Sequence, residues 1–219
     1  MLISRRFVSL AIATAVALSG CVVATLFYGA ELWPAFLRAA NQASGFLAAG
    51  YYPQFRMVTV FATLNSLGAG PWLSFLAQGA VATFTIGAIV WGIARELPFR
   101  SQAAIVCAST LSISPYCYDY DLTILGVGLA FVLPDLIARS SKREGLALWL
   151  LLWLGCGQGF ALNTVFAHVA SSSWLGAASD CPSLSAPVLL ALYAICFHVL
   201  RRPASEPESY LLAKAQRST

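Results

Sequence analysis

Ser114-Pro115-Tyr116-Cys117-Tyr118-Asp119-Tyr120-Asp121 lies between two apolar runs and decides how the rest of the chain is interpreted. This turn holds two of the nine acidic residues and three of the eight tyrosines of the chain. Because a carboxylate is costly in hydrocarbon, a pair of carboxylates at a membrane boundary indicates a functional site. We therefore expect the remaining residues to form a scaffold that presents the turn.

The composition is that of a membrane protein. Of the 219 residues, 59% are hydrophobic and 10% are charged, whereas about 25% of the residues of a soluble domain are charged. The predicted fold class is an all-α polytopic membrane protein, with a membrane domain over residues 1–202 and a polar cytoplasmic tail over 203–219. The net charge of +4 is modest, and no basic face suggests a nucleic-acid partner.

Six apolar runs are interpreted as transmembrane helices. They lie at residues 7–29, 72–94, 102–114, 122–137, 146–169 and 187–200. Every basic cluster except Arg38 and Arg56 falls on one side of this arrangement, as the positive-inside rule requires of the cytoplasmic side. The sequence therefore predicts cytoplasmic termini and places residues 30–70, 115–121 and 170–185 on the outer face.

The first run follows Arg5 and Arg6 and is interpreted as an uncleaved helix. The alternative is a cleaved leader, because Leu18-Ser19-Gly20-Cys21 resembles the cleavage box of a lipoprotein. The apolar residues continue beyond Cys21, which favours the uncleaved helix.

Two shorter patterns follow the first run. Residues 31–50 carry apolar side chains at helical spacing opposite a polar face, which predicts a helix in the outer interface. The second pattern, from Arg56 to Gly68, covers only about eleven residues, roughly 16 Å of helix, and cannot cross a hydrocarbon core of about 30 Å. We expect a re-entrant or interfacial helix there, with Thr59 and Thr63 on its polar face.

Within the central turn, Pro115 disfavours helical geometry at Ser114 and so ends the preceding helix. Asp119 can cap the next helix, and Asp121 is expected near its N-terminus, where the helix dipole favours an anion. Residues two apart point in different directions on a helix, so the two carboxylates are expected to play different roles. Capping alone does not explain the tyrosines. The alternative is sugar binding, in which carboxylates accept hydroxyls and aromatic rings cover the apolar faces of the sugar.

Three further features involve residues outside the turn. Arg56 is a candidate for binding a lipid-linked phosphate, with a headgroup-facing arginine as the alternative. Gly155 and Gly159 form a GxxxG pattern, which favours close helix packing within the chain or between two copies. A disulfide between Cys117 and Cys181 is left open.

Asp135 and Arg139, four residues apart, are expected to form an ion pair on one helix face. The sequence contains no metal-binding pattern, glycine-rich phosphate loop or catalytic triad, so no metal or cofactor is expected.

The central turn, followed by a helix rich in Leu, Gly and Ala, resembles a recurrent motif of the bacterial glycosyltransferase family 87, also called DUF2029. The stretch from Arg56 to Leu64 and the segment around Trp33 are similar to that family as well, so the resemblance covers about residues 25–140. It implies a GT-C-type transferase with its active site on the outer face. It also implies that this chain corresponds to the C-terminal half only, because the proposed catalytic carboxylate of the family lies in a first outer loop, where this chain offers only Glu31.

From this resemblance we expect transfer of a sugar from a polyprenyl-phosphate donor to an outer-face acceptor at a bacterial inner membrane. The expected site consists of the catalytic or sugar-positioning Asp119 and Asp121 and the substrate-binding Arg56, Tyr116, Tyr118 and Tyr120. The general base would come from a partner half, and Gly155 and Gly159 are a possible contact with that half or with a second copy. The alternative is a non-enzymatic membrane protein, such as a transporter fragment or an assembly subunit.

Overall fold

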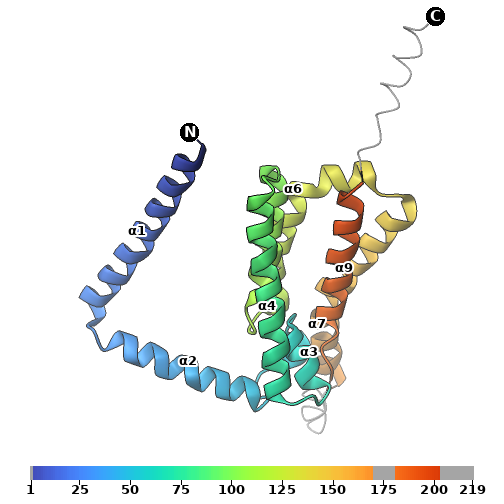
Figure 1. The fold of residues 1–219 in the computed structure, drawn as a ribbon. Helices are drawn as coiled ribbons and strands as arrows, with labels where there is room; N and C mark the ends of the chain where they lie inside the picture. The colour runs from blue at the N-terminus through green and yellow to red at the C-terminus, as the bar shows by residue number, and fades with distance from the viewer. Residues whose placement is uncertain (1, 170–180, 203–219) are drawn as a thin grey trace, which may run out of the picture. The chain divides into compact units, whose positions relative to one another are not determined.

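The computed structural model describes residues 2–169 and 181–202 (Figure 1). The regular structure of these residues is helical, and one isolated antiparallel bridge joins Met57 to Tyr118. Among the described residues, four helices are long and apolar enough to cross a membrane. The all-α, polytopic membrane fold is thus confirmed. The predicted tail at 203–219 and the part of the outer loop at 170–180 lie outside the described residues.

The chain divides into two compact units, Met1–Tyr51 and Tyr52–Thr219. The predicted division into a membrane domain over residues 1–202 and a tail over 203–219 stays a prediction. The first unit consists of α1 (Leu2–Tyr28) and α2 (Leu32–Ala48). Within it, Trp33 Nε1 donates a hydrogen bond of 3.0 Å to Thr25 Oγ1, which joins the two helices near their connection. Both helices were predicted, whereas the position of α2 in a membrane interface stays a prediction.

The second unit carries the central turn. Its helices are α3 (Val60–Ser66), α4 (Pro71–Ala94), α5 (Phe99–Ile113), α6 (Thr123–Arg139), α7 (Lys142–Val169) and α9 (Ser185–Leu200), with short 3-10 turns η1 (Gln54–Arg56) and η2 (Asp119–Leu122). Helix α5 packs against both α4 and α6, and α7 packs against α9. Successive long helices reverse direction, so the turn before α6 lies at one end of the unit, near α3 (Figure 1).

Three segments of this unit have the length and hydropathy of membrane spans, namely Pro71–Ala94, Asp119–Arg139 and Lys142–Val165, and the fourth candidate is Ala11–Tyr28 in the first unit. Helices α5 and α9 have 15 and 16 residues, fewer than the roughly 20 needed to cross a bilayer without tilt or thinning. All six predicted apolar runs are therefore helices, while six crossings stay a prediction.

The segment after Arg56 differs from the amphipathic helix that we expected. Met57 is extended, and α3 begins only at Val60. The predicted polar face is buried, because Thr59 is 2% and Thr63 is 9% exposed. Thr59 tolerates burial because its hydroxyl caps α3 by accepting from Ala62 N at 3.1 Å and donates to a carbonyl of the central turn. The segment is packed inside the unit, so its polar face contacts protein, and a re-entrant or interfacial position stays a prediction.

Gln78 of α4 holds this inserted segment in place. Its Oε1 accepts from Phe61 N at 3.1 Å, and its Nε2 donates to Ser112 O at 2.7 Å. The side chain is 4% exposed. Backbone groups buried away from water need such partners, so one amide satisfies the start of α3 and the end of α5 together.

Candidate functional site

The central turn and the segment after Tyr52 form one structure. Val58 N donates to Cys117 O at 3.0 Å, and the antiparallel bridge between Met57 and Tyr118 lies beside this bond. Ser114 is extended, as expected before Pro115. Two stretches about sixty residues apart in the chain are thus fixed against each other by their backbones.

Arg56 and Asp119 form a bidentate ion pair at this junction. Arg56 Nε donates to Asp119 Oδ2 at 3.0 Å, and Arg56 Nη2 donates to Asp119 Oδ1 at 2.9 Å. The side chain of Arg56 is 33% exposed and that of Asp119 is 10% exposed. The hydrogen bonds that Arg56 donates to Asp119 raise the pKa of Arg56. Two-point geometry of this kind is stronger than a single contact and fixes the orientation of both groups.

Asp121 has a different role. Its Oδ2 accepts from Tyr118 N at 2.9 Å, and its own N–H donates to Tyr118 O at 3.0 Å. This is a capping arrangement at the start of η2, where a carboxylate is favoured. The prediction that Asp119 and Asp121 differ in role agrees with these contacts, but Asp121 and not Asp119 makes the capping hydrogen bond.

Tyr118 and Tyr120 lie near Arg56, and Tyr52 and Tyr116 form a second ring pair in the same region. The rings of Tyr118 and Tyr120 are stacked, with centroids 5.5 Å apart and planes 8° from parallel. Tyr52 and Tyr116 meet edge to face at 6.4 Å. Burial, with Tyr120 and Tyr52 nearby, raises the pKa of Tyr118, and Arg56 opposes this shift. Tyr120 is 63% exposed, so the stacked pair presents an aromatic surface at the end of the unit.

Gly159 of α7 gives Asp119 the space it occupies. A Cβ placed on Gly159 would lie 2.6 Å from Asp119 Oδ2, closer than real Cβ contacts. A Cβ on Gly155 would instead meet Leu189 and Val188 of α9 at 3.4 and 3.6 Å. The GxxxG pattern therefore packs within this chain, one glycine against a helix and the other against the ion pair. A contact between copies through the same glycines stays a prediction.

The sequence predicted the nearness of Arg56 to the acidic turn, and the structure brings them together. It did not predict that Arg56 would pair with Asp119, since the two are 63 residues apart. Tyr52, Gly159 and Ser183 were also missed. Ser183 donates to Met57 O at 2.6 Å and so ties the start of α9 to this site. Among these three residues, only Gly159 was noticed in the sequence, where its GxxxG spacing was interpreted as helix packing.

Cys117 and Cys181 are both free thiols, and Cys117 is buried. Burial raises the pKa of Cys117 to about 11. The disulfide that the sequence left open is therefore not formed in this structure.

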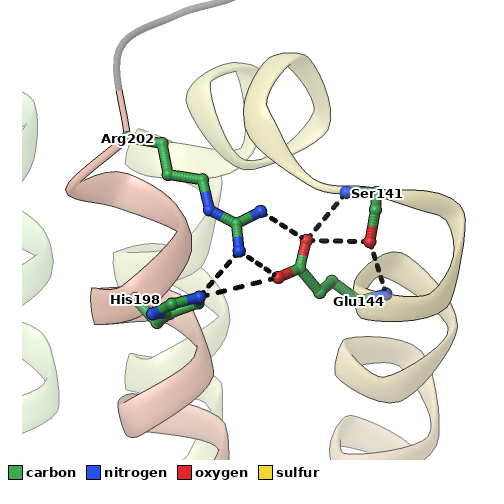
Figure 2. Close-up of polar contacts among 4 residues, drawn as sticks. All are labelled: Ser141, Glu144, His198 and Arg202. Carbon is green, nitrogen blue, oxygen red and sulfur yellow. Dashed lines mark hydrogen bonds and ion pairs between the residues drawn. The ribbon is translucent and has the colours of Figure 1, made fainter.

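A second polar cluster joins the start of α7 to the end of α9, at the end of the unit remote from the central turn. Figure 2 shows its four residues, Ser141, Glu144, His198 and Arg202. Glu144 accepts from Ser141 N and from Arg202 Nη1, each at 2.9 Å, and His198 Nε2 lies 2.7 Å from Arg202 Nη2. Ser141 and Glu144 form a capping box at the start of α7. The cluster joins the start of α7 to the end of α9, and each of its groups is used in that junction, so it is interpreted as structural.

The expected ion pair between Asp135 and Arg139 is present at 2.7 Å. Arg139 also donates to Leu200 O and Arg202 O at 2.9 and 2.7 Å, which binds the end of α6 to the end of α9. Within residues 2–169 and 181–202, no group of three or more His, Cys, Asp or Glu side chains could hold a metal ion.

No match was found when the chain was compared with models of protein families, with curated protein sequences and with solved structures.

Proposed function

We propose that this chain works as the C-terminal half of a membrane glycosyltransferase, and that the junction of Arg56 with the central turn binds the phosphate and sugar of a polyprenyl-phosphate donor. The observation that carries the proposal is the Arg56–Asp119 pair beside the stacked rings of Tyr118 and Tyr120. A cation, a fixed carboxylate and aromatic faces at the end of a helix bundle are the groups that a charged lipid head bearing a sugar requires.

Arg56 supplies the phosphate contact. Nε and one N–H of Nη2 are used by Asp119, and Nη1 makes no hydrogen bond to the part of the chain that the structure describes. A guanidinium has five N–H donors, so Nη1 can take a phosphate oxygen while the ion pair stays intact. The 33% exposure of the Arg56 side chain gives that oxygen access.

Asp119 orients Arg56 and offers its remaining lone pairs to a sugar hydroxyl, and Tyr118 and Tyr120 cover an apolar ring face of the sugar. Tyr116 completes the wall through its contact with Tyr52. Asp121 acts as a positioning residue, because its carboxylate is used to cap η2. In this proposal a second polypeptide supplies the base that deprotonates the acceptor hydroxyl.

The proposed location is a bacterial inner membrane, with both termini in the cytoplasm and the central turn on the outer face. The supporting observation is the placement of charge in the second unit. Arg95, Arg100, Lys142, Arg143 and Arg201 all lie at the end remote from the turn, as the positive-inside rule expects of the cytoplasmic end.

A second candidate is a non-enzymatic assembly subunit or transporter fragment. The observation that favours it is the closed, bidentate geometry of Arg56 and Asp119, with Gly159 fitted against the carboxylate. Such a pair can fix two chain segments without any ligand, because breaking it leaves an uncompensated charge.

Binding of a polyprenyl-phosphate sugar by the purified full chain separates the two candidates. Asp119→Asn keeps the size of the side chain but removes its charge, and it should abolish saturable binding. Asp135→Asn is the matched control, because Asp135 pairs with an arginine at the opposite end of the unit, and it should bind like the wild type. Equal binding by both variants, with unchanged helical content, would leave the assembly role as the better account.

A further inference from the structure

The end of the second unit remote from the central turn carries a set of exposed basic side chains. Helices α4, α6 and α9 finish at this end, and α5 and α7 begin there (Figure 1). The exposed basic residues are Arg95, Arg100, Lys142, Arg143 and Arg201, which we call the basic rim.

Within residues 2–169 and 181–202, the acids at this end do not neutralise the basic rim. Asp135 is used by Arg139 at 2.7 Å, and Glu144 is used by Arg202 at 2.8 Å. These four residues are partly buried, whereas the five residues of the rim are exposed and form no ion pair with the described residues. Glu96 is the one exposed carboxylate among residues 91–100, 135–144 and 196–202. Among the described residues, internal pairing therefore leaves a net positive charge on the outside of this end.

Apolar side chains lie next to the basic rim. Trp91, Ile93 and Phe99 flank Arg95 and Arg100 and are 45%, 45% and 74% exposed. Phe197, which is 53% exposed, lies 5.3 Å below the guanidinium of Arg201. Large exposed apolar groups within one turn of exposed cations are typical of side chains whose stems lie in hydrocarbon and whose charges reach the headgroup layer.

We infer that the basic rim binds the phosphates of anionic phospholipids. The partner is a lipid headgroup because large exposed apolar side chains lie beside the charged ones, as they do where a helix end meets the headgroup layer. This inference does not depend on sugar transfer by the opposite end of the unit.

The test measures which lipids stay bound to the purified full chain. The protein is exchanged into bicelles of phosphatidylcholine with a minority of phosphatidylglycerol, and the retained lipids are counted by native mass spectrometry. The wild type should enrich phosphatidylglycerol over its bulk share by roughly fivefold, which corresponds to the about 1 kcal/mol expected for one basic residue at an anionic surface.

Two variants decide the outcome. One carries Gln at all five rim positions and should lose the enrichment. The other, Arg95→Lys, Arg100→Lys, Arg143→Lys and Arg201→Lys, keeps every charge and should retain it. No enrichment by the wild type, enrichment that survives in the Gln variant, or loss in both variants would each overturn the inference.

If the variant with five Gln substitutions does not fold, three partial variants take its place, one for each group of rim residues that are near in sequence. These are Arg95→Gln with Arg100→Gln, Lys142→Gln with Arg143→Gln, and Arg201→Gln alone. Each should lower the enrichment in part, and three partial variants with wild-type enrichment would refute the assignment.

Discussion

Gly159→Ala tests whether the Arg56–Asp119 pair depends on the clearance that α7 provides. The added Cβ would lie 2.6 Å from Asp119 Oδ2, and ordinary contact begins at 3.4 Å. The oxygen must therefore retreat, which lengthens or bends its 3.0 Å bond from Arg56 Nε. Overpacking of this kind costs about 1–3 kcal/mol, while Ala in place of Gly within a helix regains about 1 kcal/mol.

Gly157→Ala is the matched control on the same helix. The atom nearest to a Cβ there is Trp153 Cε3 at 3.8 Å, an ordinary contact, so this variant should show only the gain of about 1 kcal/mol in helix propensity. We expect Gly159→Ala to be less stable than Gly157→Ala by about 1–3 kcal/mol.

The assay is reversible unfolding of the purified chain in mixed micelles, titrated with a denaturing detergent and followed by helical circular dichroism. A double-mutant cycle with Asp119→Ala completes it, because removal of the carboxylate removes the closest contact and should reduce the cost of Gly159→Ala. If Gly159→Ala is as stable as Gly157→Ala, the ion pair does not rely on this clearance and the reasoning fails.

Three further predictions concern single side chains. Gln78→Leu leaves two buried backbone groups unsatisfied and should cost about 2–6 kcal/mol in the same unfolding assay, at about 1–3 kcal/mol for each group; a loss below that range would mean that water or another side chain replaces the amide. Ser141→Ala removes the cap of α7 and should cost about 1 kcal/mol, whereas no loss would show that Glu144 caps the helix alone. Burial and a pKa of about 11 keep Cys117 a thiol at neutral and mildly alkaline pH, so it should react with a maleimide far more slowly than it does in the unfolded chain; equal rates before and after unfolding would contradict its burial.

The helices of this protein could be predicted from the sequence because each depends on local information. Apolar runs of the required length became α1, α4, α6 and α7, and Pro115 ended α5 by restricting its own neighbour. The pair of Asp135 with Arg139 was predictable for the same reason, since four residues make one helical turn.

The interior of the site could not be predicted, because its contacts join distant segments. Nothing local to Arg56 indicates Asp119 as its partner, and nothing local to Gly159 indicates a carboxylate above it. The burial of Thr59 and Thr63 was missed since their spacing fits a surface helix equally well. Only the bonds from Gln78 and the central turn decide between these arrangements.

The hydrogen bonds of Gln78 connect residues that are synthesised at different times. Its amide joins Phe61, seventeen residues earlier, to Ser112, which leaves the ribosome thirty-four residues later. The short helix α3 is synthesised before either partner, so its hydrogen bonds to Gln78 can be completed only after α4 and α5 have been made. A nascent chain arrested before Ser112 should therefore leave residues 54–66 open to protease, and the same residues should become protected once translation passes the central turn.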